Sequence, residues 1–292
     1  AQKRSTVLDG QTEKSNSGEG LEIIRAGEAD SRIWDAYVNA HPGATMAHLF
    51  GWKEVIETTY GHETFYLMAV ERSPDKNAFP QERLCGLVPL VHLKSVLFGN
   101  ELVSMPFLDT GGILADDAAT EQALWSEVLR LAESRGAGAV ELRQPNPLQF
   151  HNFTRENNTP VIPECRRDIR DPVFSDACRV PDRVRNDRKM SHAKVSIRTD
   201  KVRMFLPLPS NSEDLMASFK SKLRSQIRKP IRESLEAVAG GSELLDDFYR
   251  VFCVNMRELG SPVHAKAFFS NILKKFSEQA NVILVKSQDG AS

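Results

Sequence analysis

The first half of the chain alternates between two hydrophobic periods, one typical of strands and one typical of helices. Runs of alternating or continuous apolar residues predict strands over 21–27, 65–71, 84–93, 101–107 and 139–143. Apolar residues spaced three or four positions apart predict helices over 29–40, 49–60 and 120–135. A Pro- and Asn-rich turn joins the second and third strands into a hairpin. We therefore expect an α+β fold built on mixed sheets.

The second half repeats this mixture of elements after a long polar interval. The pattern predicts strands over 201–208 and 281–287, and helices over 213–235, 243–259 and 265–278. Asn211 or Ser212 can cap the first helix, and Gly260 ends the second. Residues 146–198 hold Pro, Asn, Asp and Arg without any lasting period, so we interpret them as an inserted, mostly disordered linker. Residues 1–20 are polar and read as a disordered tail.

The predicted helix over 213–235 carries two parallel stripes. One stripe is apolar and recurs every four residues: Leu215, Phe219, Leu223, Ile227, Ile231 and Leu235. The other is cationic and lies one position further on: Lys220, Arg224, Arg228 and Arg232. Like charges at this spacing repel by roughly 0.2–0.5 kcal/mol per pair, which a bound anion would relieve. The stripe indicates a phosphate-bearing ligand, or else an ordinary solvated face, and Pro230 predicts a kink.

Charge divides the chain in the same way as the hydrophobic pattern. The formal net charge of −1 over 292 residues combines an acidic half and a basic half. Residues 1–150 hold 13 Lys/Arg against 21 Asp/Glu, and residues 151–292 hold 25 against 18. An anionic ligand would favour the second half. The four cysteines lack zinc-site spacing, which predicts reduced thiols and no metal. No apolar run is long enough for a membrane helix, and the N-terminus is no signal peptide, so we expect a cytoplasmic protein.

Several long phrases, in the same order along the chain, resemble one family. In the first half they are WKEVIETTYGH from Trp52, GLVPLVHLKSVLFGNELVSMPFLDTGG from Gly86 and VELR from Val140. In the second half they are TDKVRMFLPLP from Thr199, FKSKLRSQIRKPIRESLEA from Phe219 and LLDDFYRVFCVNMRELGSPV from Leu244. These phrases are similar to FemAB-type transferases, and most similar to the subgroup associated with exosortase/PEP-CTERM exopolysaccharide systems.

The resemblance implies two GNAT-like domains, over 21–145 and 199–292, with the second incomplete at its C-terminus. It also implies transfer of an acyl or aminoacyl group to an amine of a cell-envelope or exopolysaccharide precursor. Acyl-CoA or aminoacyl-tRNA would be the donor, with no tightly bound cofactor. The chain departs from the family by its 146–198 insertion and by its early end. Two alternatives stay open: an inactive remnant or interaction module of the same fold, and RNA binding through the basic helix 220–232.

Two residues are candidates for the chemistry. Asp109 stands in MPFLDTGG at a strand end, where two glycines let backbone approach a ligand, although an Asp that only binds its own turn is commoner. His62 can act as a base, or can simply end the preceding helix. For the phosphate of a ligand we predict residues of the second half, the last two of them by family resemblance: Lys201, Arg203, Lys220, Arg224, Arg228, Asn255 and Arg257.

Overall fold

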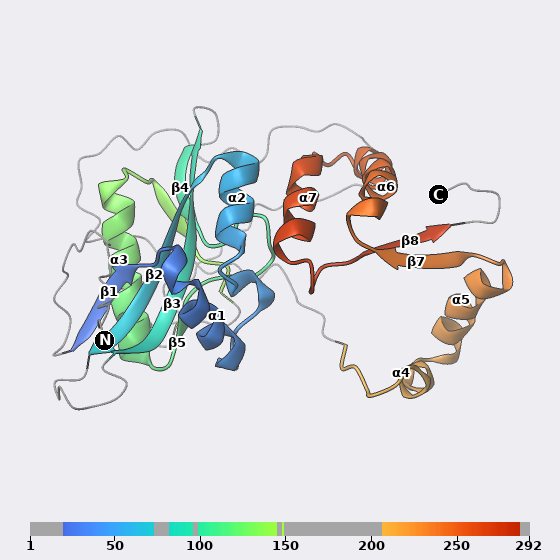
Figure 1. The fold of residues 1–292 in the computed structure, drawn as a ribbon, viewed down its shortest axis with the longest axis horizontal. Coiled ribbons are helices and arrows are strands. Elements are labelled where there is room, and N and C mark those ends of the chain that lie inside the picture. Colours follow the sequence, from blue (N-terminus) through green and yellow to red (C-terminus); the bar gives the residue numbers. More distant parts are fainter. Residues whose placement is uncertain (1–19, 73–81, 96–98, 145–147, 149–205, 287–292) are drawn as a thin grey trace, which may run out of the picture.

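The computed structural model describes residues 20–72, 82–95, 99–144, 148 and 206–286. The described residues up to 148 form a mixed sheet with helices on both faces (Figure 1). Its strands follow the order β1-β2-β3-β4-β6, and β5 pairs with β3. β4 and β6 pair in parallel and the other neighbours are antiparallel. The strands are β1 (Leu21–Arg25), β2 (Glu63–Arg72), β3 (Glu82–Ser95), β4 (Gly99–Val103), β5 (Leu114–Ala115) and β6 (Ala139–Glu141). This mixed architecture confirms the α+β prediction.

The central hairpin β2–β3 is buried on both faces because helices cover each side. Phe65 and Leu67 of β2 face the helix α3 (Ala118–Ser134), where they meet Leu124 and Val128. The alternate residues of β2, such as Tyr66, face α1 (Ser31–Ala40). The two-residue period of a strand therefore supplies two cores instead of one core and one wet face.

The second half, residues 206–286, contains a two-stranded antiparallel ribbon and four α-helices. The elements are α4 (Ser212–Ser218), α5 (Ser221–Arg232), β7 (Glu236–Gly240), α6 (Leu245–Glu258), α7 (Lys266–Lys275) and β8 (Val282–Lys286). Val282 and Leu284 of β8 are buried, whereas Ile283 on the opposite face is 67% exposed. The ribbon thus has one covered face and one apolar face in contact with solvent.

The two halves meet where α7 packs against α2 (Trp52–Tyr60), as Figure 1 shows. The helices run antiparallel: Trp52 meets Phe276 with ring centroids 5.1 Å apart, and Tyr60 meets Phe268 at 5.6 Å. The Asn271 amide also donates to the Thr59 hydroxyl at 3.0 Å. Phe268 is buried within the cluster that α2 forms with the sheet. An aromatic side chain of the second half therefore completes a core of the first half.

The predicted helix over 213–235 is wrong, because the structure breaks it into α4 and α5. Phe219 adopts an extended backbone with ψ 148°, and the new helix begins at Ser221. The Arg224 guanidinium donates to the carbonyls of Ala217 and Phe219, at 3.3 and 3.1 Å, so it satisfies groups left free by the break. The apolar stripe is consequently not continuous. Asn211 caps α4 as predicted, because its side chain accepts the backbone N–H of Asp214.

Pro230 lies inside α5, which ends two residues later, at Arg232, so the last residue of the predicted stripe, Leu235, is beyond the helix. The predicted strand over 101–107 is too long, since β4 ends at Val103 and Met105 has a left-handed φ of +54°. β5 and β7 had no sequence prediction.

Three further predictions fall mainly on residues outside those the structure describes. Of the predicted strand over 201–208, only 206–208 are described, and they form no strand. Of the predicted 146–198 linker, only Leu148 is described, and it packs against the α3 core. Of the predicted tail over 1–20, only Gly20 is described.

Removing the Phe268 ring tests the junction. Phe268→Ala should lower the free energy of unfolding by about 3 kcal/mol, because it leaves a cavity inside the first half's core. It should also separate the two halves into distinct unfolding transitions. The three tryptophans all lie in the first half, so urea titrations followed by tryptophan fluorescence and by far-UV circular dichroism should diverge. Phe252→Ala is the control, since that ring stacks within the second half. If the fluorescence and circular dichroism transitions of Phe268→Ala coincide, Phe268 does not couple the unfolding of the two halves.

Candidate active site at the junction of the two halves

One end of the α2–α7 pair gathers polar side chains from three elements. The Tyr60 hydroxyl at the end of α2 lies 2.9 Å from Nδ1 of His264, which precedes α7. The Tyr249 hydroxyl of α6 donates to the His264 carbonyl at 3.0 Å. Burial raises the pKa of Tyr60, with Tyr249 adding to it, so its phenol keeps its proton. Tyr60 therefore holds the imidazole of His264 in a fixed orientation.

His62 joins this group directly after the helix end. α2 stops at Gly61, whose φ of +69° suits glycine, and the chain then turns into β2. The His62 ring stacks on Tyr60 with centroids 5.9 Å apart, and it lies 6.2 Å from Phe107. Burial lowers the pKa of His62, and the nearby His92 lowers it further. A neutral imidazole with a lone pair is the form that can accept a proton.

The loop after β4 reaches the same group of side chains through Phe107. Phe107 of this loop stacks on Tyr60 with centroids 4.3 Å apart, and Asp109 follows two residues later with an exposed side chain. The sequence-predicted pair His62 and Asp109 therefore stands on two segments that meet at Phe107. No sequence spacing points to His264, which lies 204 residues beyond Tyr60.

Arg143 and Gln144, which follow β6, hold this loop in place through hydrogen bonds. The Arg143 side chain donates to the Leu108 carbonyl at 2.5 Å, and its backbone N–H donates to the buried Ser104 hydroxyl at 2.8 Å. The Gln144 amide bonds both the N–H and the carbonyl of Ile113, at 2.8 and 2.9 Å. Such a loop can present a side chain at a defined position.

His48 is linked to the same loop through Thr45 and is itself fully buried. Its Nδ1 accepts the backbone N–H of Thr45 at 3.1 Å, and the Thr45 hydroxyl lies 3.0 Å from that of Thr110. Burial lowers the pKa of His48 from 6.5 to about 4, although nearby backbone groups oppose the shift. The ring is neutral at physiological pH, and within the described residues its Nε2 has no hydrogen-bond partner.

The other end of the α2–α7 pair carries a groove of about 340 Å³. It lies among α1, the start of α2 and the end of α7. Asp35 lines it and accepts the Phe50 N–H at 2.8 Å. Burial raises the Asp35 pKa, opposed by the Phe50 bond and by Lys275. With Glu28 and Glu278 also present, carboxylates outnumber the lysine, so the groove suits a ligand with amine or hydroxyl groups.

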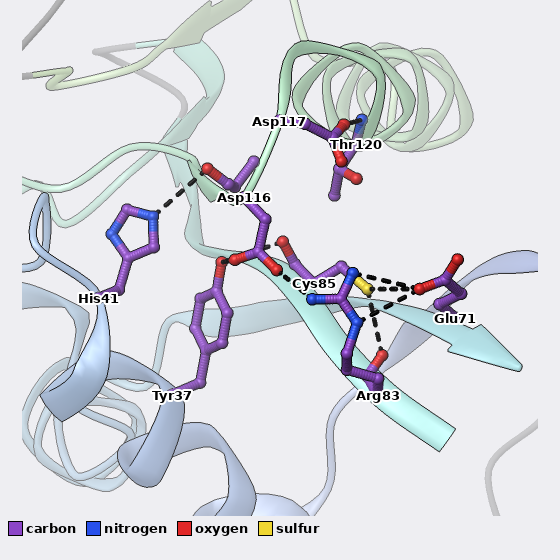
Figure 2. A network of polar contacts seen from close by, with 9 residues as sticks. Tyr37, His41, Glu71, Arg83, Cys85, Asp116, Asp117 and Thr120 are labelled. Carbon is purple, nitrogen blue, oxygen red and sulfur yellow. Dashed lines mark hydrogen bonds and ion pairs between the residues drawn. The ribbon is translucent and has the colours of Figure 1, made fainter. Parts of the chain in front are cut away.

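Figure 2 shows a polar network that fastens α1 to the sheet. The Tyr37 hydroxyl lies 2.9 Å from both the Cys85 carbonyl and the Asp116 carboxylate. Arg83 bridges Asp116 at 2.6 Å and Glu71 at 3.1 Å. Burial raises the pKa of the Cys85 thiol, which disfavours the thiolate that nucleophilic chemistry needs. We read this network as structural.

The predicted phosphate-binding residues do not converge. Lys201 and Arg203 lie outside the described residues. Arg224 binds the carbonyls at the end of α4, while Lys220 and Arg228 are exposed at α5. Figure 1 shows α5 well apart from α6, which carries Asn255 and Arg257 as exposed side chains. The described members of this set therefore lie on separate helices, and their role in phosphate binding stays a prediction.

Neither a metal centre nor a membrane span is found in the described part of the chain. No group of three or more His, Cys, Asp or Glu side chains there could hold a metal ion. None of the helices described is long and apolar enough to cross a membrane.

Comparison with known proteins supports the fold assignment. No family model and no curated protein matches this chain. Among solved structures, the crystal structure of FemX superposes with a TM-score of 0.52 at 16% sequence identity. The match covers 91% of this chain and 58% of the FemX chain, so this chain spans less than two thirds of FemX. At this identity the likeness shows that this chain shares the fold of FemX, in agreement with the mixed α+β fold that the sequence predicted.

The buried His48 predicts a pH-dependent stability. The unfolded imidazole binds its proton near pH 6.5 and the folded one only near 4, so the unfolded state gains protons first as the pH falls. Stability should be complete above pH 6.5 and lose about 3 kcal/mol by pH 4. His48→Asn keeps an acceptor for Thr45 and should flatten this part of the profile, measured by urea unfolding at several pH values. His41→Asn, the control, should keep most of the slope, because burial is the largest cause of the lowered His48 pKa and the charge of His41 is a smaller one. If the pH dependence of stability is unchanged in His48→Asn, His48 is not the group responsible for it.

Proposed function

We propose that this protein is a FemAB-type transferase that moves an acyl or aminoacyl group from an activated donor to an amine. The observation that carries the proposal is the FemX-like fold over 91% of the chain. The resemblance of the sequence phrases adds the finer expectation that the acceptor is an envelope or exopolysaccharide precursor. The donor expected is acyl-CoA or aminoacyl-tRNA, acting as substrate.

In this proposal His62 takes the proton that the acceptor amine must lose. An ammonium group has no lone pair, so attack on the donor carbonyl requires a base near the amine. The lowered pKa of His62 keeps its imidazole neutral and ready for that role. Asp109, on the loop that Phe107 anchors, would attract and orient the incoming ammonium form before the proton moves.

His264 completes the proposed site from the second half. As the amine attacks, the donor carbonyl oxygen gains negative charge, and a hydrogen-bond donor near it lowers the barrier. If Tyr60 donates its hydroxyl proton to Nδ1, the proton of the neutral imidazole is on Nε2. We assign that N–H to the oxyanion. The site would then need both halves, because His62 and His264 belong to different ones.

The groove at the far end of α2 gives the acceptor a second point of attachment. A nine-residue helix is about 13 Å long, so an extended precursor can reach both ends. Its amine would lie at His62, and its polar remainder would bind the carboxylates and amides around Asp35. A short acceptor that lacks this remainder should bind more weakly.

The test is transfer of a radiolabelled group to amine-bearing envelope and polysaccharide precursors, with labelled acyl-CoA and labelled aminoacyl-tRNA as alternative donors. His62→Asn should lower kcat by about 10²- to 10⁴-fold, the usual contribution of a general base, with little change in KM. His41→Asn, at a half-buried histidine outside the site, should retain activity. Equal rates for wild type and His62→Asn would remove His62 from the mechanism. Absence of transfer from either donor to any acceptor would instead favour an interaction module.

A further inference from the structure

The helix α5 leaves an apolar face uncovered. Leu223, Ile227 and Ile231 recur every four residues and lie on one side of the helix. Leu223 is 41% exposed and Ile231 is 69% exposed, whereas helices of globular domains usually bury such a stripe. Figure 1 places α5 at the margin of the molecule, away from α6 and α7. The exposed stripe therefore needs an apolar partner that the described chain does not supply.

Cations occupy the rest of the α5 surface. At 100° per residue, Arg228 borders the stripe, about 100° from Ile227 at its centre. Lys222, Lys229 and Arg232 lie about 140–160° from Ile227, on the opposite face of the helix. α5 contains no acidic residue. Lys229 approaches Glu233 at 3.6 Å in a well-exposed pair, which is worth little. Among the described residues, Lys222, Arg228 and Arg232 form no ion pair, so their charges are available to an anionic partner.

We propose that α5 binds the surface of an anionic membrane. A short amphipathic helix with an exposed apolar face and a cationic opposite face is the pattern of a helix that lies in the membrane interface. The apolar stripe enters the acyl boundary while the lysine and arginine heads stay among the lipid phosphates. The proposal goes beyond the transferase function and does not rest on it.

The apolar stripe distinguishes this surface from a nucleic-acid site. RNA would use the cations and would gain nothing from Leu223 and Ile231, and it usually adds aromatic stacking residues, which α5 lacks. A hollow of about 300 Å³ lined by Ser225, Arg228, Ile231 and Arg232 offers room for a lipid phosphate at the edge of the stripe. Apolar and cationic contacts thus lie side by side, as they do at a bilayer surface.

The experiment measures co-flotation of the whole protein with vesicles. We expect binding to vesicles of mixed phosphatidylcholine and phosphatidylglycerol, and much weaker binding to pure phosphatidylcholine. Ile231→Asn should weaken binding about tenfold, because the asparagine no longer favours the acyl region. Arg228→Gln with Arg232→Gln should weaken it about 25-fold, at about fivefold for each cation removed. Inorganic phosphate should not compete, since it offers no apolar phase.

Matched controls separate this surface from general stickiness. Ile283→Asn makes the same change at a residue of β8 that is equally exposed, at 67%, and should leave binding unchanged. Arg32→Gln with Lys274→Gln removes the same charge from exposed positions of α1 and α7 and should have less than a twofold effect. Equal melting temperatures will show that all variants fold, since the substituted side chains are exposed.

Three results would overturn the proposal. The first is absence of binding to the anionic vesicles. The second is a loss of vesicle binding with the arginine variant but not with Ile231→Asn, which would indicate a site for a soluble polyanion. The third is tighter binding to a short single-stranded RNA than to vesicles, unaffected by Ile231→Asn, which would support the RNA alternative.

Discussion

The packing of α2 against α7 joins the two halves of the described chain and places the candidate site. α2 already packs against the sheet through Val55 and Ile56, so α7 adds a further layer to the same core. The rings of Phe268 and Phe276 occupy positions that the first half alone would leave open to water. Because the two helices are antiparallel, the start of α7 meets the end of α2. That geometry brings His264 to Tyr60 and His62.

Burial around this junction favours neutral forms of the ionisable groups. Desolvation lowers the pKa of His48 and His62 and raises that of Asp35 and Tyr60. In each case the charged form loses more hydration free energy on burial than it gains from interactions with its neighbours. The consequence for chemistry is a site with neutral imidazoles at physiological pH. Proton transfer to His62 would then not require a prior deprotonation of the enzyme.

α5, which lies apart from the junction, combines cations and no acidic residue with an exposed apolar stripe. The transferase proposal and the membrane proposal therefore use different parts of the molecule. They are also compatible, since a precursor carried by a lipid would be met at a membrane surface. The fold shared with FemX supports the transferase proposal. The membrane proposal rests on the surface of α5 alone.

The sequence by itself determined the elements whose stability is local. The apolar runs of β2 and β3 and the glycine at 260 predicted strands and a helix end that the structure contains. These predictions are correct because backbone preferences and hydrophobic periodicity act within a few residues. Local pattern also favoured one helix over 213–235, yet the bonds of Arg224 to Ala217 and Phe219 stabilise a break there. A continuous helix and a broken helix have similar local energies here, so such contacts between a side chain and the backbone decide between them.

Only the tertiary structure decided which functional side chains meet. The sequence marked His62 and Asp109 as candidates, but the partnership of Tyr60 with His264 spans 204 residues and has no signature in spacing. The sequence likewise assigned Arg224, Arg228 and Asn255 to one phosphate, whereas Figure 1 shows their helices, α5 and α6, apart. Contacts between distant segments depend on how α7 packs on α2, and the apolar residues that direct this packing are indistinguishable, in the sequence, from any other buried face.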